Sequence, residues 1–273
     1  MLAKILLVLP MLGAEPTISD ATIDNGIRVH RVTSEFQAGE TQIRVLLPDS
    51  WEPGELLPTL YLLPVQANTE SRYGDGMVEA QRLNLANKHR LICVAPTFSH
   101  LPWYADHPQD TTILQESYFL KVVIPAVEKR YPACPEACGR LLVGFSKSGY
   151  GAWSLLLRHP DRFAKAAAWD APLMKTLPDQ FGMGPIYGSA ENFQHYRLDS
   201  LLRDRADRLR QPPDKPAEPR LIHLGYGNFR EHHQQAERLL SELGIPHQFV
   251  DGPQREHTWH SGWLGDAVNR LCE

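Results

Sequence analysis

Short apolar runs alternate with helical patterns along most of this chain, and this alternation constrains the fold more than any other feature of the sequence. Eight apolar runs are predicted to be strands, at residues 27–32, 43–47, 59–65, 91–95, 141–144, 166–169, 221–224 and 247–250. From the third run onward they alternate with helical patterns, which are clearest at residues 115–131, 149–159, 198–209 and 231–243. Strands that alternate with helices favour a parallel sheet covered by helices on both faces. We therefore predict an α/β fold with a mostly parallel sheet, whose first two strands form an antiparallel edge.

The length and composition fit one domain. The chain has 273 residues, of which 42% are hydrophobic and 22% are charged, enough for one large core. We predict a single domain at residues 15–273, with the proline-rich segment 211–219 as a surface loop inside it. The net charge is −4, and the arginines of residues 203–210 alternate with aspartates, as on a solvated helix face. Neither nucleic acid nor an anionic membrane is therefore expected as a partner.

The first 14 residues resemble a short secretory signal. Lys4 precedes an apolar run at residues 5–12, and two small residues follow it. This run is too short to span a bilayer. We predict that residues 1–14 are a signal peptide and that the protein is secreted or periplasmic; the alternative is a cytoplasmic enzyme that starts with a buried strand. In an oxidising compartment Cys134 and Cys138 could close a small loop, and no cysteine pair has the CxxC spacing of a zinc site.

A serine stands at the junction between a predicted strand and a predicted helix. In the segment Gly144-Phe-Ser146-Lys-Ser148-Gly149, the residue at the turn is Ser146. A nucleophile elbow strains the serine on such a turn and raises its hydroxyl above the sheet edge, and Gly144 leaves room for the neighbouring backbone. Choosing Ser148 instead would put Ser146 and Tyr150 at positions that need small residues. We therefore predict that Ser146 is the nucleophile.

A histidine follows the last predicted strand. Functional residues of parallel sheets collect at the carboxyl ends of the strands, and His257 lies in the loop after residues 247–250. We predict that it is the general base for Ser146. The aromatic bulk of Trp259 and its neighbours is expected to fix this loop. His260 is the rival base.

Two carboxylates are candidates for the acid that orients this histidine. Asp170 directly follows the predicted strand 166–169, the next strand after the one that carries the serine. From there it could accept a hydrogen bond from the imidazole and stabilise the imidazolium. Glu231 lies one helical turn beyond Asn228, after the strand at residues 221–224. We prefer Asp170 and keep Glu231 as the alternative.

An oxyanion hole requires two backbone N–H groups that point at the developing negative charge. Lys147, which follows the predicted nucleophile, supplies one. The second is expected from the loop after residues 59–65. Because Pro64 has no N–H, we place this donor at Gln66.

Taken in order, several segments resemble the esterase D-like branch of the α/β-hydrolases, which includes feruloyl and acetyl-xylan esterases, S-formylglutathione hydrolase and the mycolyltransferases. The resemblance covers roughly residues 40–270. Its segments are Leu60-Tyr-Leu-Leu, Val94-Ala-Pro-Thr, Trp103-Tyr104-Ala-Asp106, the run from Ser117 to Pro125 with Tyr131-Pro132 after it, Gly144-Phe-Ser-Lys and His257-Thr-Trp.

This resemblance implies the α/β-hydrolase fold and a Ser–His–acid carboxylesterase that needs no cofactor. It further implies that Trp103 and Tyr104 lie near the acyl or sugar pocket. The chain departs from the family pattern at three points. Ser148 replaces a glycine, Pro64-Val65 replaces His-Gly, and Asn228 stands at the usual position of the acid.

The sequence therefore predicts a serine carboxylesterase that forms a covalent acyl-enzyme from a small-molecule or carbohydrate ester. The alternatives are an acyltransferase with the same site and a non-catalytic binding protein with a hydrolase fold. A metal hydrolase would use His232 and His233 with His257 and His260. Adjacent helical residues point in different directions, however, and no carboxylate has a recognised ligand spacing, so we predict no metal site.

Overall fold

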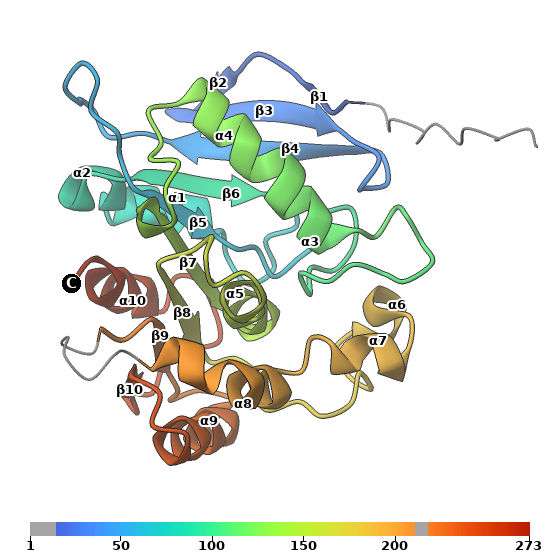
Figure 1. The fold of residues 1–273 in the computed structure, drawn as a ribbon. Coiled ribbons are helices and arrows are strands. Elements are labelled where there is room, and N and C mark those ends of the chain that lie inside the picture. The colour runs from blue at the N-terminus through green and yellow to red at the C-terminus, as the bar shows by residue number, and fades with distance from the viewer. Residues whose placement is uncertain (1–14, 211–217) are drawn as a thin grey trace, which may run out of the picture.

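The computed structural model describes residues 15–210 and 218–273, and these form one twisted sheet with helices on both faces (Figure 1). The strand order is β1-β3-β4-β6-β5-β7-β8-β9-β10, and β2 pairs with β3. The six strands from β5 to β10 are parallel, whereas β3 and β4 run antiparallel at one edge. The predicted α/β architecture with an antiparallel N-terminal edge is thus confirmed. The predicted signal peptide at residues 1–14 and most of the predicted loop at residues 211–219 lie outside the described residues.

The strands lie where the apolar runs predict them. Their bounds are β1 Thr17–Ile18, β2 Thr22–Asp24, β3 Ile27–Thr33, β4 Glu40–Leu46, β5 Thr59–Leu62, β6 Ile92–Pro96, β7 Arg140–Phe145, β8 Lys165–Trp169, β9 Leu221–Leu224 and β10 His247–Val250. The short edge strands β1 and β2 carry almost no buried side chains, so no apolar run in the sequence predicts them.

The helices that matter for the site follow β7 and β9. The bounds are α1 Gly76–Arg82, α2 Leu85–His89, α3 Gln115–Tyr118, α4 Ile124–Arg130, α5 Ser146–Arg158, α6 Met183–Tyr187, α7 Ala190–Gln194, α8 Leu198–Leu209, α9 Arg230–Glu242 and α10 Trp263–Cys272, with a π-helical turn at Phe119–Val123 and a 3-10 turn at Ala137–Gly139. Within the described residues, no helix combines the length and the apolar character needed to cross a membrane.

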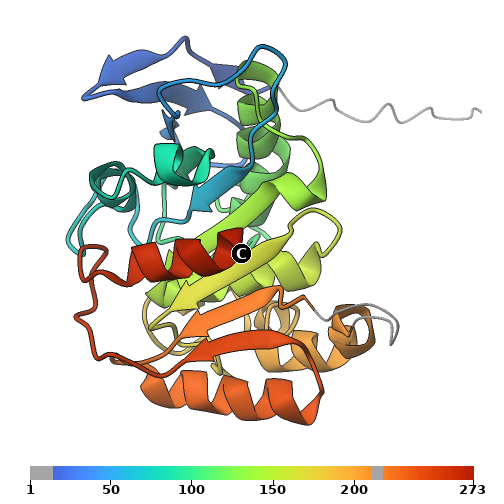
Figure 2. The ribbon, with the colours of Figure 1, turned by 90° about the vertical axis from the view of Figure 1, so that its left-hand side faces the viewer.

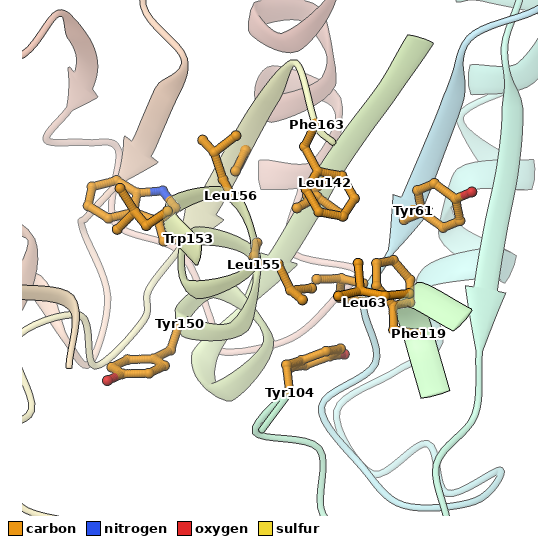
Figure 3. Packing of buried hydrophobic residues seen from close by; sticks show 14 of the residues in the cluster. Tyr61, Leu63, Tyr104, Phe119, Leu142, Tyr150, Trp153, Leu155, Leu156 and Phe163 are labelled. Carbon is orange, nitrogen blue, oxygen red and sulfur yellow. The ribbon is translucent and has the colours of Figure 1, made fainter. Parts of the chain in front are cut away.

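Two separate hydrophobic clusters show that both faces of the sheet are covered. Leu142 of β7 belongs to a cluster with side chains of α4, α5 and α8, which is drawn in part in Figure 3. Its neighbours Leu141 and Val143 belong instead to a second cluster, with side chains of α1, α2 and α10, and Figure 2 shows α10 crossing that face. Successive residues of a strand point to opposite faces, so the continuous apolar run in β7 is what a strand buried on both sides requires.

The register of the central strands determines which residues meet at the carboxyl edge. Phe145 of β7 pairs with Trp169 of β8, and these are the last residues of their strands. The next residue of each chain segment is Ser146 and Asp170. These two predicted site residues therefore leave the sheet side by side.

Candidate active site

Ser146 occupies a sharp turn between β7 and α5. Its backbone is in the left-handed region, with a φ of 52°, which is strained for a residue that carries a side chain. The first turn of α5 packs directly against Gly144, and an added Cβ there would lie 2.5 Å from the backbone of Ser148. The glycine thus lets β7 pass directly into α5 and raises Ser146 at the sheet edge, as a nucleophile elbow does.

Ser148, the other serine of the motif, has its hydroxyl engaged inside the elbow. The side chain is fully buried. Its Oγ accepts a hydrogen bond from the backbone N–H of Phe145 at 3.0 Å and donates to the carbonyl of the same residue at 2.9 Å. The serine that replaces the second glycine of the motif therefore braces the turn, and its hydroxyl does not face a substrate.

Asp170 is fully buried and also has a left-handed backbone, with a φ of 38°. Its Oδ1 accepts the backbone N–H of Phe229 at 2.6 Å. Gly227 makes this approach possible, because a Cβ there would lie 2.4 Å from Oδ2. Sequence reasoning missed both contacts, although Gly225-Tyr-Gly227 after β9 was a visible signal that backbone and side chain come close at this strand end.

His257 is brought to the same place from the loop after β10. Its Nδ1 donates a hydrogen bond to Oδ2 of Asp170 at 2.6 Å, and its side chain keeps 16% of its surface exposed. The imidazole packs edge-on against Phe145, the residue before Ser146, with ring centroids 5.0 Å apart. In the described residues no hydrogen bond joins the Ser146 hydroxyl to Nε2 of His257, so Nε2 remains available to accept a proton.

Aromatic side chains fix the histidine loop. Trp259 is buried, its backbone N–H donates to the carbonyl of Tyr73 at 2.9 Å, and its ring lies 5.1 Å from that of Phe145. The ring of Tyr73 in turn packs edge-on against His257 at 5.6 Å. The aromatic bulk that the sequence placed around this loop therefore holds the imidazole over the strand ends.

The rival base and the rival acid lie elsewhere. Nδ1 of His260 donates to Glu79 at 3.0 Å, and its Nε2 faces the backbone N–H of Asp75 at 3.4 Å, both at the start of α1. Glu231 is exposed in the first turn of α9 and accepts a hydrogen bond from Gln235 at 3.2 Å. The structure thus brings Asp170, and not Glu231, to His257.

The two predicted oxyanion donors come after the carboxyl ends of two paired strands, β5 and β7. Lys147 is the second residue of α5, and the first backbone N–H groups of a helix have no acceptor within it. Burial lowers the pKa of the Lys147 side chain. Gln66 follows β5, which pairs with β7, and in the described part of the chain its backbone N–H has no acceptor. Its side chain is held aside, because Oε1 accepts the N–H of Tyr73 at 3.1 Å.

Trp103 and Tyr104, the predicted substrate contacts, are both fully buried. The hydroxyl of Tyr104 donates to the carbonyl of Pro64 at 2.7 Å, and its ring lies against α5, where a Cβ on Gly151 would be 2.0 Å from it. Trp103 packs on Tyr150 with centroids 5.6 Å apart. In this conformation the pair links the predicted oxyanion loop to α5, and direct contact with a substrate stays a prediction.

A pocket of about 430 Å³ borders the predicted oxyanion loop. Its walls include Gln66, Arg44, Asp75 and Trp259. Neither Ser146 nor His257 lines this pocket. It is therefore a neighbour of the candidate site and does not supply a cavity for the acyl group.

The histidines considered for a metal site do not converge. His257 and His260 bind Asp170 and Glu79, as described above. His232 accepts the backbone N–H of Met174 through Nδ1 at 3.1 Å, and His233 accepts that of Ala171 through Nε2 at 2.8 Å. All four cysteines are free thiols, including Cys134 and Cys138 of the proposed loop.

Comparison with known proteins identifies the family and the fold. The family model described as "Putative esterase" matches residues 34–211. Esterase Rv1288 of Mycobacterium tuberculosis is 25% identical over 254 residues, which cover 77% of this chain and 51% of the relative, so the chain spans about half the length of the curated relative it matches.

Two solved structures share the fold. The fluorophosphonate-binding serine hydrolase FphF of Staphylococcus aureus has a TM-score of 0.73 at 20% identity and covers 90% of this chain and 98% of its own. The S-formylglutathione hydrolase FrmB of Staphylococcus aureus has a TM-score of 0.70 at 18% identity, with 95% and 100% covered. At these identities the likeness establishes the fold.

Proposed function

We propose that this chain, which belongs to the esterase family whose model matches residues 34–211, hydrolyses carboxylic esters through Ser146. The family membership and the shared fold confirm the resemblance to esterase D-like α/β-hydrolases that the sequence indicated. One observation carries the proposal furthest. His257 hydrogen-bonds Asp170 at 2.6 Å and packs on Phe145, the residue directly before the strained Ser146. The predicted nucleophile, base and acid therefore all lie at the ends of β7 and β8.

The first half of the proposed reaction acylates the enzyme. The Oγ of Ser146 attacks the ester carbonyl while Nε2 of His257 takes the hydroxyl proton. The negative charge that develops on the carbonyl oxygen is stabilised by the N–H groups of Lys147 and Gln66. The tetrahedral intermediate collapses, the alcohol leaves with the proton from His257, and the acyl group stays on Ser146. Asp170 holds the imidazole in the required tautomer and stabilises its cation.

The second half of the proposed reaction hydrolyses the acyl-enzyme and regenerates the free Ser146 hydroxyl. A water molecule gives its proton to His257 and attacks the acyl-enzyme, and the new tetrahedral intermediate releases the carboxylic acid as Ser146 regains its proton. The reaction needs no electron transfer and no group beyond water and these side chains.

Covalent labelling tests the nucleophile. A fluorophosphonate probe is expected to label the folded wild-type protein at Ser146 and to leave the Ser146→Ala variant unlabelled. Peptide mapping of the labelled protein identifies the modified residue. Wild-type protein that is folded and yet takes no label would refute the proposal.

We propose small-molecule or carbohydrate esters as the substrate class. The family membership supports ester chemistry, and the pocket beside Gln66 offers polar and charged side chains to a polar alcohol group. A panel of acetyl, feruloyl, longer acyl and thioester substrates ranks the acyl groups by kcat/KM. Adding a competing alcohol and analysing the products separates hydrolysis from acyl transfer, because a transferase makes the new ester in preference to the free acid.

A further inference from the structure

The turn that carries Asp170 is bound to the first turns of α9 by two adjacent histidines. His233 accepts the backbone N–H of Ala171 through Nε2 at 2.8 Å, and His232 accepts that of Met174 through Nδ1 at 3.1 Å. The histidine pair, which the sequence offered as metal ligands, therefore binds backbone donors. His233 holds the peptide group directly after Asp170.

This anchor lies where the backbone is strained. Asp170 has a φ of 38°, a strain of order 1–3 kcal/mol for a residue with a side chain, which persists only where the surroundings hold the residue in place. Its carboxylate is fixed by Phe229, and the peptide after it is fixed by His233. Loss of the second anchor would let the turn relax and carry the carboxylate away from His257.

The hydrogen bonds determine the tautomers of the buried histidines. Because Nε2 of His233 accepts the Ala171 N–H, the proton of a neutral His233 must be on Nδ1. Nδ1 of His233 lies 3.2 Å from Nδ1 of His223, which must then be the acceptor. The proton of His223 is therefore on Nε2, which points toward the carboxylate of Glu237 at 3.6 Å.

These tautomers argue against a metal ion bound by His223 and its neighbours Glu237 and His247. Nε2 of His223 and Nε2 of His247 lie 3.6 Å and 2.6 Å from the same carboxylate oxygen of Glu237, and these three side chains are a ligand set that suits zinc. A metal would need the lone pair on Nε2 of His223, however, and that atom carries the proton. Moving the proton to Nδ1 would force an N–H of His233 against the N–H of Ala171.

The surroundings keep both histidines neutral. Both are fully buried, and burial lowers the pKa of His223 to about 4 and that of His233 well below its usual value. Phe249 stacks on His223, and Gly225 leaves the space that His233 fills, since a Cβ there would be 2.5 Å from the histidine Cβ. The ionisable groups that face the pair are Glu237, His232 and His247, and Lys175 lies beyond His232.

We propose that His233 is a positioning residue for the triad acid: as a neutral imidazole whose tautomer is fixed by His223, it anchors the Ala171 peptide and keeps the Asp170 carboxylate on His257. This inference rests on the proposed function, because it assigns a role to Asp170 in catalysis. The residue acts through the backbone and touches no reacting atom.

The tautomers can be observed without any measurement of activity. In protein labelled with ¹⁵N-histidine, two-dimensional NMR is expected to show His233 protonated on Nδ1 and His223 protonated on Nε2. A proton on Nε2 of His233 would overturn the inference. So would stoichiometric binding of Zn²⁺ that is lost when His223 and His247 are replaced.

A matched pair of variants separates positioning from stability. In His233→Gln the amide oxygen can take the place of Nε2 and accept the Ala171 N–H, whereas the shorter His233→Asn cannot reach it. We expect His233→Asn to lower kcat roughly 10-fold to 100-fold with KM unchanged, because the carboxylate no longer holds the imidazole in place. His233→Gln should restore kcat to near the wild-type value. His247→Asn, at the far end of the cluster, should leave kcat unchanged.

The outcomes are distinct. Equal kcat values for folded His233→Asn, His233→Gln and wild type would refute the positioning role. An equal loss of kcat in His233→Gln and His233→Asn at equal thermal stability would also refute it, because the amide that can replace Nε2 would then bring no rescue. Failure of the wild type itself to react with a fluorophosphonate would refute the proposed function and leave the NMR result in place.

Discussion

Phe145 and Trp169 are paired across β7 and β8 as the last residues of their strands. The residues that follow them, Ser146 and Asp170, therefore leave the sheet on neighbouring strands, and both have left-handed backbones. His257 bridges this edge, packed on Phe145 and bonded to Asp170. An acid on the strand next to the nucleophile can thus serve the histidine while Asn228, at the family's usual acid position, is exposed.

Asp170→Asn is expected to abolish most of the activity. The amide keeps the size of the side chain but cannot stabilise the imidazolium and favours the wrong tautomer of His257, so kcat should fall about 10³-fold to 10⁴-fold. Glu231→Gln is the matched control and should stay within a few-fold of wild type, because Glu231 contacts Gln235 and not His257. Ester hydrolysis by the three proteins side by side decides the assignment, and the reverse order of activities would contradict it.

Gly227→Ala is expected to impair catalysis through sterics alone. The added methyl group would lie 2.4 Å from Oδ2 of Asp170, so this carboxylate would have to move away from His257. We expect a loss in kcat of roughly 10-fold to 100-fold. Gly265→Ala provides the control, since its Cβ would meet only a flexible leucine methyl at 3.8 Å. The test is to measure kcat of both variants at a temperature where both are folded. Wild-type activity for Gly227→Ala would show that the carboxylate is not held as described.

The fold and the order of the site residues were predictable because both follow from local patterns. Apolar runs mark the strands, and the rule that functional residues follow the carboxyl ends of parallel strands selects Ser146, Asp170 and His257. The choice between Asp170 and Glu231 needed coordinates. Both follow strand ends, and only the register of β7 with β8 and the path of the last loop show which one reaches His257.

The sequence could not reveal contacts that depend on backbone groups or on burial. Trp103 and Tyr104 form a buried link between Pro64 and α5, and nothing in an aromatic pair distinguishes a pocket wall from such a link. Similarly, the adjacent histidines of α9 accept backbone N–H groups from a turn about 60 residues earlier, a partnership that no spacing indicates.

Ser148→Ala should separate structure from chemistry within the elbow. The substitution removes the hydroxyl that joins the N–H and the carbonyl of Phe145, so the free energy of unfolding should fall by about 1–3 kcal/mol. Because Ser146 remains, a fluorophosphonate should still label the protein, whereas Ser146→Ala should lose all label. Urea unfolding checks the expected loss of stability, and fluorophosphonate labelling checks that the nucleophile is retained. Loss of label in folded Ser148→Ala with retention in Ser146→Ala would identify Ser148 as the nucleophile.

The free energy of unfolding is expected to fall as the pH is lowered from about 6.5 to about 4, because of His223. Burial lowers the pKa of this histidine to about 4 in the folded protein, while the unfolded chain has the ordinary histidine value of 6.5. Between these values the unfolded state binds a proton that the folded state does not, so acid favours unfolding, and the full effect is about 3 kcal/mol. Glu237, whose pKa is lowered to about 2 chiefly by His223, extends the same trend below pH 4.5.

Urea unfolding at half-unit steps of pH measures the slope of the free energy of unfolding against pH. His223→Leu should make the slope shallower between pH 6.5 and 4 and leave the part that the buried, neutral His233 contributes, whereas substitution of the exposed His195 by Gln should not change it. An unchanged slope in His223→Leu would show that this imidazole is charged or exposed in the folded protein.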